Sequence, residues 1–110
     1  MWVDLDPVRG SETNKRRPAV VVSNDGANRI AERLARGAVT VVPVTRRTDR
    51  IYPFQVLLPA ESCGLAAASK AQAEQVRPVA VERISSVGGR LPADLLEELD
   101  DAMRLHLGLT

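Results

Sequence analysis

The sequence is poor in the residues that usually carry metal or nucleophile chemistry. Its 110 residues include one cysteine, Cys63, and one histidine, His106. A single cysteine excludes an intramolecular disulfide, which fits a reducing compartment. Because Cys63 and His106 lie far apart in the sequence, no ligand spacing predicts a zinc site. We therefore expect a site with no metal and no cofactor.

Long apolar runs are also missing. No stretch approaches the roughly 20 apolar residues of a membrane-spanning helix. The chain opens Met1-Trp2-Val3-Asp4, without the basic and apolar pattern of a secretion signal. We expect a cytoplasmic protein with no membrane association, and residues 1–110 fit a single domain.

An excess of one charge is absent too, since the net charge is +1. The two signs are nevertheless separated along the chain, because the last segment is acidic and the earlier part is basic. Such separation predicts a face for a polyanion, and scattered solvated arginines are the alternative. The basic residues that suggest such a face are Lys15, Arg16, Arg17, Arg46, Arg47, Arg50, Lys70 and Arg77.

What the sequence does contain is mostly strand-like. β-Branched runs and alternating apolar residues predict several strands, and Pro43 and Pro53 indicate edges or irregularities. A polar loop is expected over 6–16 and a short helix over 28–36. The expected strands are Val3–Leu5, Ala19–Val22, Ala38–Thr45, Ile51–Leu58, Ser69–Val76 and Ile84–Val87.

The final segment, 92–107, predicts a helix that begins near Pro92 and stops at Gly108. Its apolar stripe consists of Leu95, Leu99, Ala102, Met103 and Leu107. His106 falls within this stripe, so we interpret it as a packed or interface histidine rather than a catalyst. Several strands and one terminal helix predict a mainly β or α+β fold, a small antiparallel sheet or partly open barrel.

RNA cleavage is a chemistry that needs few special residues. The 2′-hydroxyl is an internal nucleophile, so a protein need only assist proton transfer and neutralise charge on the phosphorane. Arg17 suits the second task, because a guanidinium matches phosphate oxygens and Pro18 favours an extended backbone. Thr45 ends the strand over 38–45 and would reach the same rim if the strands pair antiparallel. Taken singly, each residue is also an ordinary strand-end side chain.

Tyr52 and Phe54 could stack on unpaired bases, although their alternation favours core packing for at least one of them. Taken in order, several short pieces make the sequence resemble the MazF/PemK/Kid family of bacterial toxins, and its actinobacterial members above all. These pieces are Trp2-Val3-Asp4-Leu5-Asp6-Pro7, Gly10-Ser11-Glu12, the run over 16–25, Pro43-Val44-Thr45, Tyr52-Pro53-Phe54 and the run over 71–77.

The resemblance implies a Kid-like, SH3-like barrel with a C-terminal helix, and a homodimer. It implies a metal-independent, sequence-specific endoribonuclease acting on single-stranded RNA, usually mRNA and sometimes tRNA or rRNA. Products would carry a 2′,3′-cyclic phosphate and a 5′-hydroxyl. The cognate partner would be a MazE-like antitoxin with a DNA-binding part and a flexible acidic tail.

In residue terms, Arg17 matches the family's catalytic arginine and Thr45 its catalytic threonine. Ser69, Glu74 and Gln75 match positions that contact RNA bases. The full set of expected RNA-binding residues is Ser11, Glu12, Lys15, Arg16, Tyr52, Phe54, Ser69, Lys70, Gln72, Glu74 and Gln75. Two features depart from the pattern. Members usually carry residues before the position of Trp2, and Arg46-Arg47 replace smaller polar residues after Thr45.

Two other functions share the expected fold. A CcdB-like toxin binds DNA gyrase and catalyses nothing, but such toxins resemble each other at a C-terminal segment containing tryptophan. Here the only tryptophan is Trp2, and the chain ends Leu107-Gly108-Leu109-Thr110. An inactive interaction module that keeps the fold is the third possibility.

Overall fold

The computed structural model describes residues 2–5, 17–23 and 37–109. Within these ranges the chain forms a seven-stranded antiparallel sheet with strand order β4-β5-β3-β2-β1-β7, and β6 also pairs with β3. The strands are β1 (Trp2–Leu5), β2 (Arg17–Val21), β3 (Ala38–Thr45), β4 (Gln55–Leu58), β5 (Ser69–Gln72), β6 (Arg77–Ala80) and β7 (Ile84–Val87). The helical segments are α2 (Ala60–Cys63), η1 (Ala73–Gln75), η2 (Val81–Arg83) and α3 (Ala93–Leu107).

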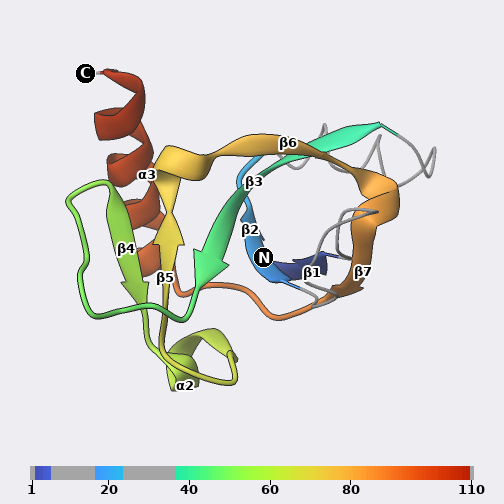
Figure 1. Cartoon of the computed structure of the whole chain (residues 1–110), viewed down its shortest axis with the longest axis horizontal. Coiled ribbons are helices and arrows are strands. Elements are labelled where there is room, and N and C mark those ends of the chain that lie inside the picture. Colours follow the sequence, from blue (N-terminus) through green and yellow to red (C-terminus); the bar gives the residue numbers. More distant parts are fainter. Residues whose placement is uncertain (1, 6–16, 24–36, 110) are drawn as a thin grey trace.

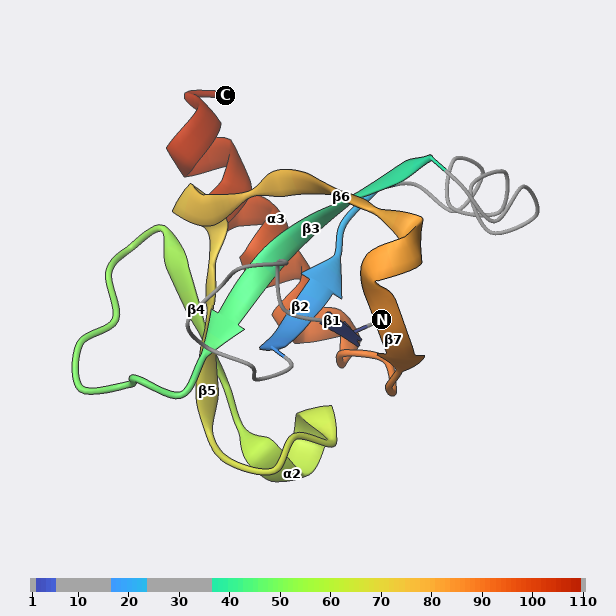
Figure 2. The same ribbon diagram turned by 45° about the vertical axis from the view of Figure 1, so that its right-hand side comes forward.

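The sheet is buried on both faces. Ala19 and Val20 are adjacent in β2, and both are fully buried, in two different apolar clusters. The cluster around Val20 packs against α3, while the cluster around Ala19 is enclosed by β1, β3 and β6. Figures 1 and 2 show α3 on one side of the sheet, with β6 and β7 curving around the other. Two buried faces explain why β2 reads as a continuous apolar run, and the expected barrel with a C-terminal helix is confirmed.

β3 is the central strand, and it changes partner along its length. Ala38 to Val41 pair with β6, whereas Val44 and Thr45 pair with β5. Pro43 falls in the gap between these two partners, while on its other side it pairs with Ala19 of β2. A proline lacks the N–H that a ladder needs, so a change of partner accommodates it. Of the two alternatives expected at Pro43, an edge strand is wrong because β3 is central, whereas an irregularity is present as the change of partner.

The expected strand over 51–58 is shorter in the structure. Only Gln55–Leu58 form β4, because the backbone N–H of Gln55 donates to the carbonyl of Tyr52 (2.9 Å) and closes a turn at Pro53. Tyr52 is 42% exposed, so it is not a core residue. The strand expected over 69–76 likewise ends at Gln72, where η1 begins. Neither α2 nor β6 was predicted from the sequence.

Helix α3 follows the expected pattern at both ends. Pro92 caps its start, and Gly108 stops it in the left-handed conformation with φ of 71°. Leu95, Leu99 and Ala102 are buried, but the stripe ends before Leu107, which is 52% exposed. His106 is also exposed, so its expected packing within the chain is wrong. An interface role for His106 stays a prediction.

Two further expectations cannot be compared with the structure, and two can. The polar loop over 6–16 and the helix over 28–36 lie outside the described residues. The strand expected at the start of the chain is β1, and the one expected over 84–87 is β7. In the part of the chain that the structure describes, no helix is long and apolar enough to cross a membrane.

Candidate active site

The register of β2 and β3, when it is extended to the ends of both strands, sets Arg17 opposite Thr45. The pairs Ala19–Pro43, Val20–Val42 and Val21–Val41 define this register, and two more residues extend it to the start of β2 and the end of β3. Residues directly opposite each other in an antiparallel pair share one face of the sheet. Arg17 is exposed and Thr45 is half-buried. The two candidates therefore occupy the same rim, as antiparallel pairing predicted.

Strand β5 adds a third residue beside Arg17 and Thr45, because Lys70 of β5 pairs with Thr45. By alternation, Lys70 and Thr45 lie on the face away from α3, since the neighbouring Ala71 and Val44 belong to the cluster that packs against that helix. Lys70 is only 8% exposed. Its ammonium donates to the carbonyl oxygen of Arg50 at 2.7 Å.

Thr45 makes a local hydrogen bond through its side chain. The backbone N–H of Arg47 donates to Oγ1 of Thr45 at 3.3 Å, which closes a turn after β3. Because Oγ1 is the acceptor in this bond, the hydroxyl hydrogen can still be donated to another group. Arg46 and Arg47 are both exposed beside this hydroxyl. The rim therefore combines a hydroxyl donor with several guanidinium groups.

The only tyrosine and the only phenylalanine stack on each other beside the rim. The ring centres of Tyr52 and Phe54 are 5.4 Å apart and the rings are tilted by 6°. The guanidinium carbon of Arg50 lies 5.7 Å from the centre of the Tyr52 ring, and the Lys70 ammonium lies 6.0 Å from it. Phe54 is half-buried and Tyr52 is more exposed. Tyr52 is thus the outer member of the stack.

A chain of polar side chains holds the turn that carries this stack. The backbone N–H of Tyr52 donates to Oε1 of Gln55 at 3.1 Å, and Nε2 of Gln55 donates to Oε2 of Glu74 at 2.7 Å. Oε1 of Glu74 is buried and has no hydrogen-bond partner among the described residues. Gln55 was not a sequence candidate. A polar glutamine directly before the apolar run Val56-Leu57-Leu58 was the sequence signal that could have found it.

The remaining sequence candidates are scattered. Ser69 is buried, and its hydroxyl donates to the carbonyl of Ala67 at 2.9 Å. Gln72 is half-buried at the end of β5, whereas Gln75 is exposed in η1. The other four candidates lie outside the described residues: Ser11, Glu12, Lys15 and Arg16.

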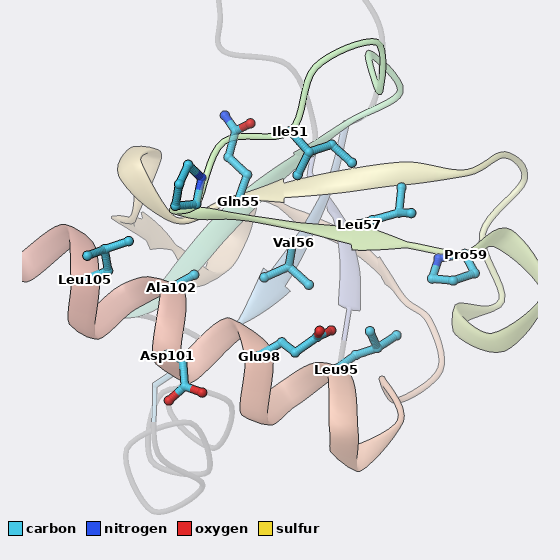
Figure 3. Close-up of a pocket in the computed structure, with 11 residues that line it drawn as sticks. Ile51, Gln55, Val56, Leu57, Pro59, Leu95, Glu98, Asp101, Ala102 and Leu105 are labelled. Carbon is cyan, nitrogen blue, oxygen red and sulfur yellow. The ribbon is translucent and has the colours of Figure 1, made fainter.

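A separate pocket of about 630 Å³ lies between β4 and α3 (Figure 3). Val56, Leu95 and Ala102 line it, together with the carboxylates of Glu98 and Asp101. Val56 belongs to the cluster that packs against α3, while Leu57, which pairs with Lys70, also lines the pocket, so the pocket lies along the β4 edge of the sheet. Its carboxylates would repel a polyanion. The rim at Arg17 and Thr45 is therefore the better candidate for phosphate chemistry.

Nucleophilic and metal chemistry have little support among the described residues. Cys63 is buried, and burial raises the pKa of its thiol, so its reactive thiolate is disfavoured. Across the described ranges, no group of three or more His, Cys, Asp or Glu residues could hold a metal ion.

Comparison with known proteins adds both sequence and structural likenesses. Residues 1–107 match the profile of a family described as PemK-like, MazF-like toxin of type II toxin–antitoxin system. Endoribonuclease MazF9 of Mycobacterium tuberculosis is 59% identical over 110 residues, which cover 99% of this chain and 93% of that protein. Endoribonuclease MazF6 of the same species is 32% identical over 108 residues, covering 98% and 92%.

Solved structures agree in fold. The M. tuberculosis toxin MazF-mt6 superposes with a TM-score of 0.76 at 21% identity, covering 100% of this chain and 99% of that one. A MazE–MazF structure from Deinococcus radiodurans has a TM-score of 0.73 at 29% identity, covering 99% and 92%.

Proposed function

This chain belongs to the PemK-like, MazF-like toxins of type II toxin–antitoxin systems, and from that premise we propose that it is an endoribonuclease. It would cleave single-stranded RNA at specific sequences, without a metal ion. The proposal is supported by the antiparallel β2–β3 register, which sets Arg17 opposite Thr45 when it is extended by two residues. Arg17, which can bind a phosphate, and Thr45, which can donate its hydroxyl hydrogen, then lie at the same rim of the sheet.

In the proposed reaction the 2′-oxygen bonds to phosphorus as its proton passes to solvent water. The bond between phosphorus and the 5′-oxygen breaks, and that oxygen takes a proton from water. The products are a 2′,3′-cyclic phosphate and a 5′-hydroxyl. Arg17 stabilises the charge that builds on the phosphorane oxygens, because its planar fork can donate two hydrogen bonds to them. Thr45 donates its hydroxyl hydrogen and orients the reacting ribose or phosphate.

Base recognition is proposed next to this rim. The outer ring of the stack, Tyr52, offers an aromatic surface to an unpaired base. Gln75 is exposed in η1 and has hydrogen-bonding groups that can read a base edge. Ser69 and Glu74 stay RNA-binding predictions, although both already make hydrogen bonds within the chain.

The test is cleavage of a defined RNA library in EDTA, followed by mapping of 5′-hydroxyl ends. We expect cuts at one short recurring sequence. A protein that leaves the library intact, or that produces 5′-phosphate ends, would contradict the proposal. Arg17→Ala is the matched control, because a contaminating nuclease would survive this substitution.

We also propose an acidic, flexible antitoxin as partner. One likeness in the solved structures is a mycobacterial endoribonuclease in complex with its cognate antitoxin. The rim of this chain presents Arg17, Arg46 and Arg47 as exposed cations, and an acidic tail can occupy the place of RNA phosphates there. Competition between the antitoxin and an uncleavable oligonucleotide would test this idea. Simultaneous binding without mutual weakening would exclude occlusion.

A homodimer is the proposed assembly, with an interface on the β-rich face near the substrate groove. β4 is the last strand in the sheet order, and Leu57 on it is 44% exposed. Ile51 is also exposed nearby, and both residues line the pocket of Figure 3. Burying such side chains against a second copy would add apolar area to a small domain. Sedimentation at high micromolar concentration should show a dimer, and Leu57→Lys should weaken it.

A further inference from the structure

We infer that Lys70 is a positioning residue that fixes the segment 46–54, so that Tyr52 stands at the rim as a platform for one unpaired base. This inference rests on the proposed ribonuclease function. It assigns Lys70 a different task from the phosphate contact that its charge suggests.

The surroundings of Lys70 argue against direct contact with a phosphate. The side chain is 8% exposed, and its ammonium already donates to the Arg50 carbonyl at 2.7 Å. A buried ammonium is unfavourable unless it is hydrogen-bonded, and a bond with a charged donor is among the stronger ones. Exposed Arg46 and Arg47 are much more accessible to a phosphate than Lys70 is.

The same segment is held at a second point. Gln55 accepts a hydrogen bond from the backbone of Tyr52 and donates one to Glu74 in η1. Lys70 in β5 therefore holds the residue two places before Tyr52, at Arg50, while Gln55 holds Tyr52 itself. With both anchors in place, the Tyr52 ring is fixed against Phe54 at 5.4 Å. A fixed ring loses less freedom when a base stacks on it, so stacking is stronger.

The position of Lys70 in the sheet connects this platform to Thr45. Lys70 pairs with Thr45 across β3 and β5, and the segment it holds begins directly after Thr45. Thr45 in turn is bonded to Arg47, which lies in that segment. One side chain thus ties the base platform to the strand end that carries the hydroxyl.

The first experiment measures the segment without RNA. Hydrogen exchange is followed in the full-length wild type, in Lys70→Met, which keeps an apolar stem, and in Lys70→Arg, which keeps the charge. Arg90→Met is the matched control, because it removes an exposed cation elsewhere. We expect faster exchange over 46–54 in Lys70→Met only, with β3 and α3 protected as in the wild type. Unchanged exchange over 46–54 in Lys70→Met would overturn the inference.

The second experiment measures binding of an RNA oligonucleotide that carries a 2′-deoxy nucleotide at the mapped cleavage position. Lys70→Met should weaken binding roughly five- to hundredfold, the loss expected for one unstacked base. The slope of log affinity against log salt should not change. Loss of a phosphate contact would instead reduce that slope by about 0.7, and this result would overturn the inference. Arg46→Ala is the comparison variant, because removing this exposed cation should reduce the slope.

The third measurement asks whether Lys70 acts through Tyr52. Lys70→Met should weaken binding far less in a Tyr52→Ala background than in the wild type, because the platform is already gone. Additive losses would show that Lys70 acts independently, and the inference would fail. If Lys70→Met does not fold, Gln55→Leu releases the other anchor and is read by the same three measurements. Should the wild type neither bind nor cut RNA, the proposed function fails, while the exchange experiment still decides the anchoring.

Discussion

The indole N–H of Trp2 donates a hydrogen bond of 2.8 Å to the carbonyl oxygen of Cys63, which lies 61 residues later in the chain. The same indole ring lies against Gly88, and the backbone of Trp2 exchanges hydrogen bonds with Gly88 and Gly89. Trp2 therefore joins β1 to the end of α2 and to the segment after β7. A residue at the start of the chain fixes two distant segments.

Gly88→Ala should destabilise the fold by roughly 1–3 kcal/mol, because there is no room for an added methyl group. A Cβ at position 88 would lie 2.2 Å from Cε2 of Trp2, whereas a Cβ at position 89 would lie 3.9 Å from Nε1 of Trp2, an ordinary van der Waals contact. Gly89→Ala is thus the matched control. Chemical denaturation followed by the fluorescence of Trp2 measures both. Equal stabilities would contradict the steric argument.

Leu99→Ala should lower the free energy of unfolding by about 2–5 kcal/mol, since it opens a cavity between α3 and the sheet. Leu99 is fully buried, while Leu107 on the same helix is 52% exposed. Leu107→Ala should cost much less. Urea denaturation of both variants makes the comparison. A similar loss in the two would mean that Leu107 is covered in solution, as it would be in an interface.

Arg17→Ala should reduce kcat by roughly 10²–10³-fold, the usual loss when a donor to transition-state charge is removed. The effect should exceed that of alanine substitutions at Arg46, Arg47 and Lys70. Single-turnover cleavage of one oligonucleotide separates the chemical step from binding. Near-normal turnover in Arg17→Ala would refute its assignment.

Thr45→Ser should keep most of the activity, because the hydroxyl remains. Thr45→Val keeps the shape but not the hydroxyl, and it should be strongly impaired. The pair of variants isolates one oxygen atom, since Val and Thr fill similar volumes. Measured under the same single-turnover conditions, an active Thr45→Val would remove Thr45 from the mechanism.

Removing metal ions with EDTA should leave the rate of RNA cleavage unchanged. The reaction proposed here relies on a guanidinium and a hydroxyl, and neither needs a bound ion. Cleavage rates are compared in EDTA and in magnesium at matched ionic strength, because RNA binding depends on salt. Activity that disappears in EDTA and returns with magnesium would overturn metal-independent cleavage.

Local patterns were good guides where they matched the whole fold. Helix α3 could be placed because its apolar period, its starting proline and its terminal glycine all agree, and β3 has the bounds that its β-branched run predicts. The alternation from Tyr52 to Leu58 misled because it crosses a turn. Pro53 prevents continuous strand pairing there, and the alternating rings stack on each other at the surface.

The candidate site could likewise be predicted only in part. The strand ends could be predicted from the sequence, and they put Arg17 and Thr45 on one rim only on the condition that β2 and β3 pair antiparallel, as they do. The surroundings of Lys70 could not be foreseen. Its burial depends on how the segment 46–54 folds back over β5, a long-range arrangement that no local pattern encodes.

The pairing of β1 has a consequence for synthesis on the ribosome. β1 lies between β2 and β7, and the backbone N–H of Trp2 donates a hydrogen bond to the carbonyl of Gly89. The first strand therefore cannot complete its pairing until residues more than 80 positions later have been translated. Helix α3, which covers the cluster around Val20, is translated later still. A nascent chain therefore cannot complete this sheet while most of it is still being made. β1 can therefore pair on both sides only after residues 84–89 have left the exit tunnel.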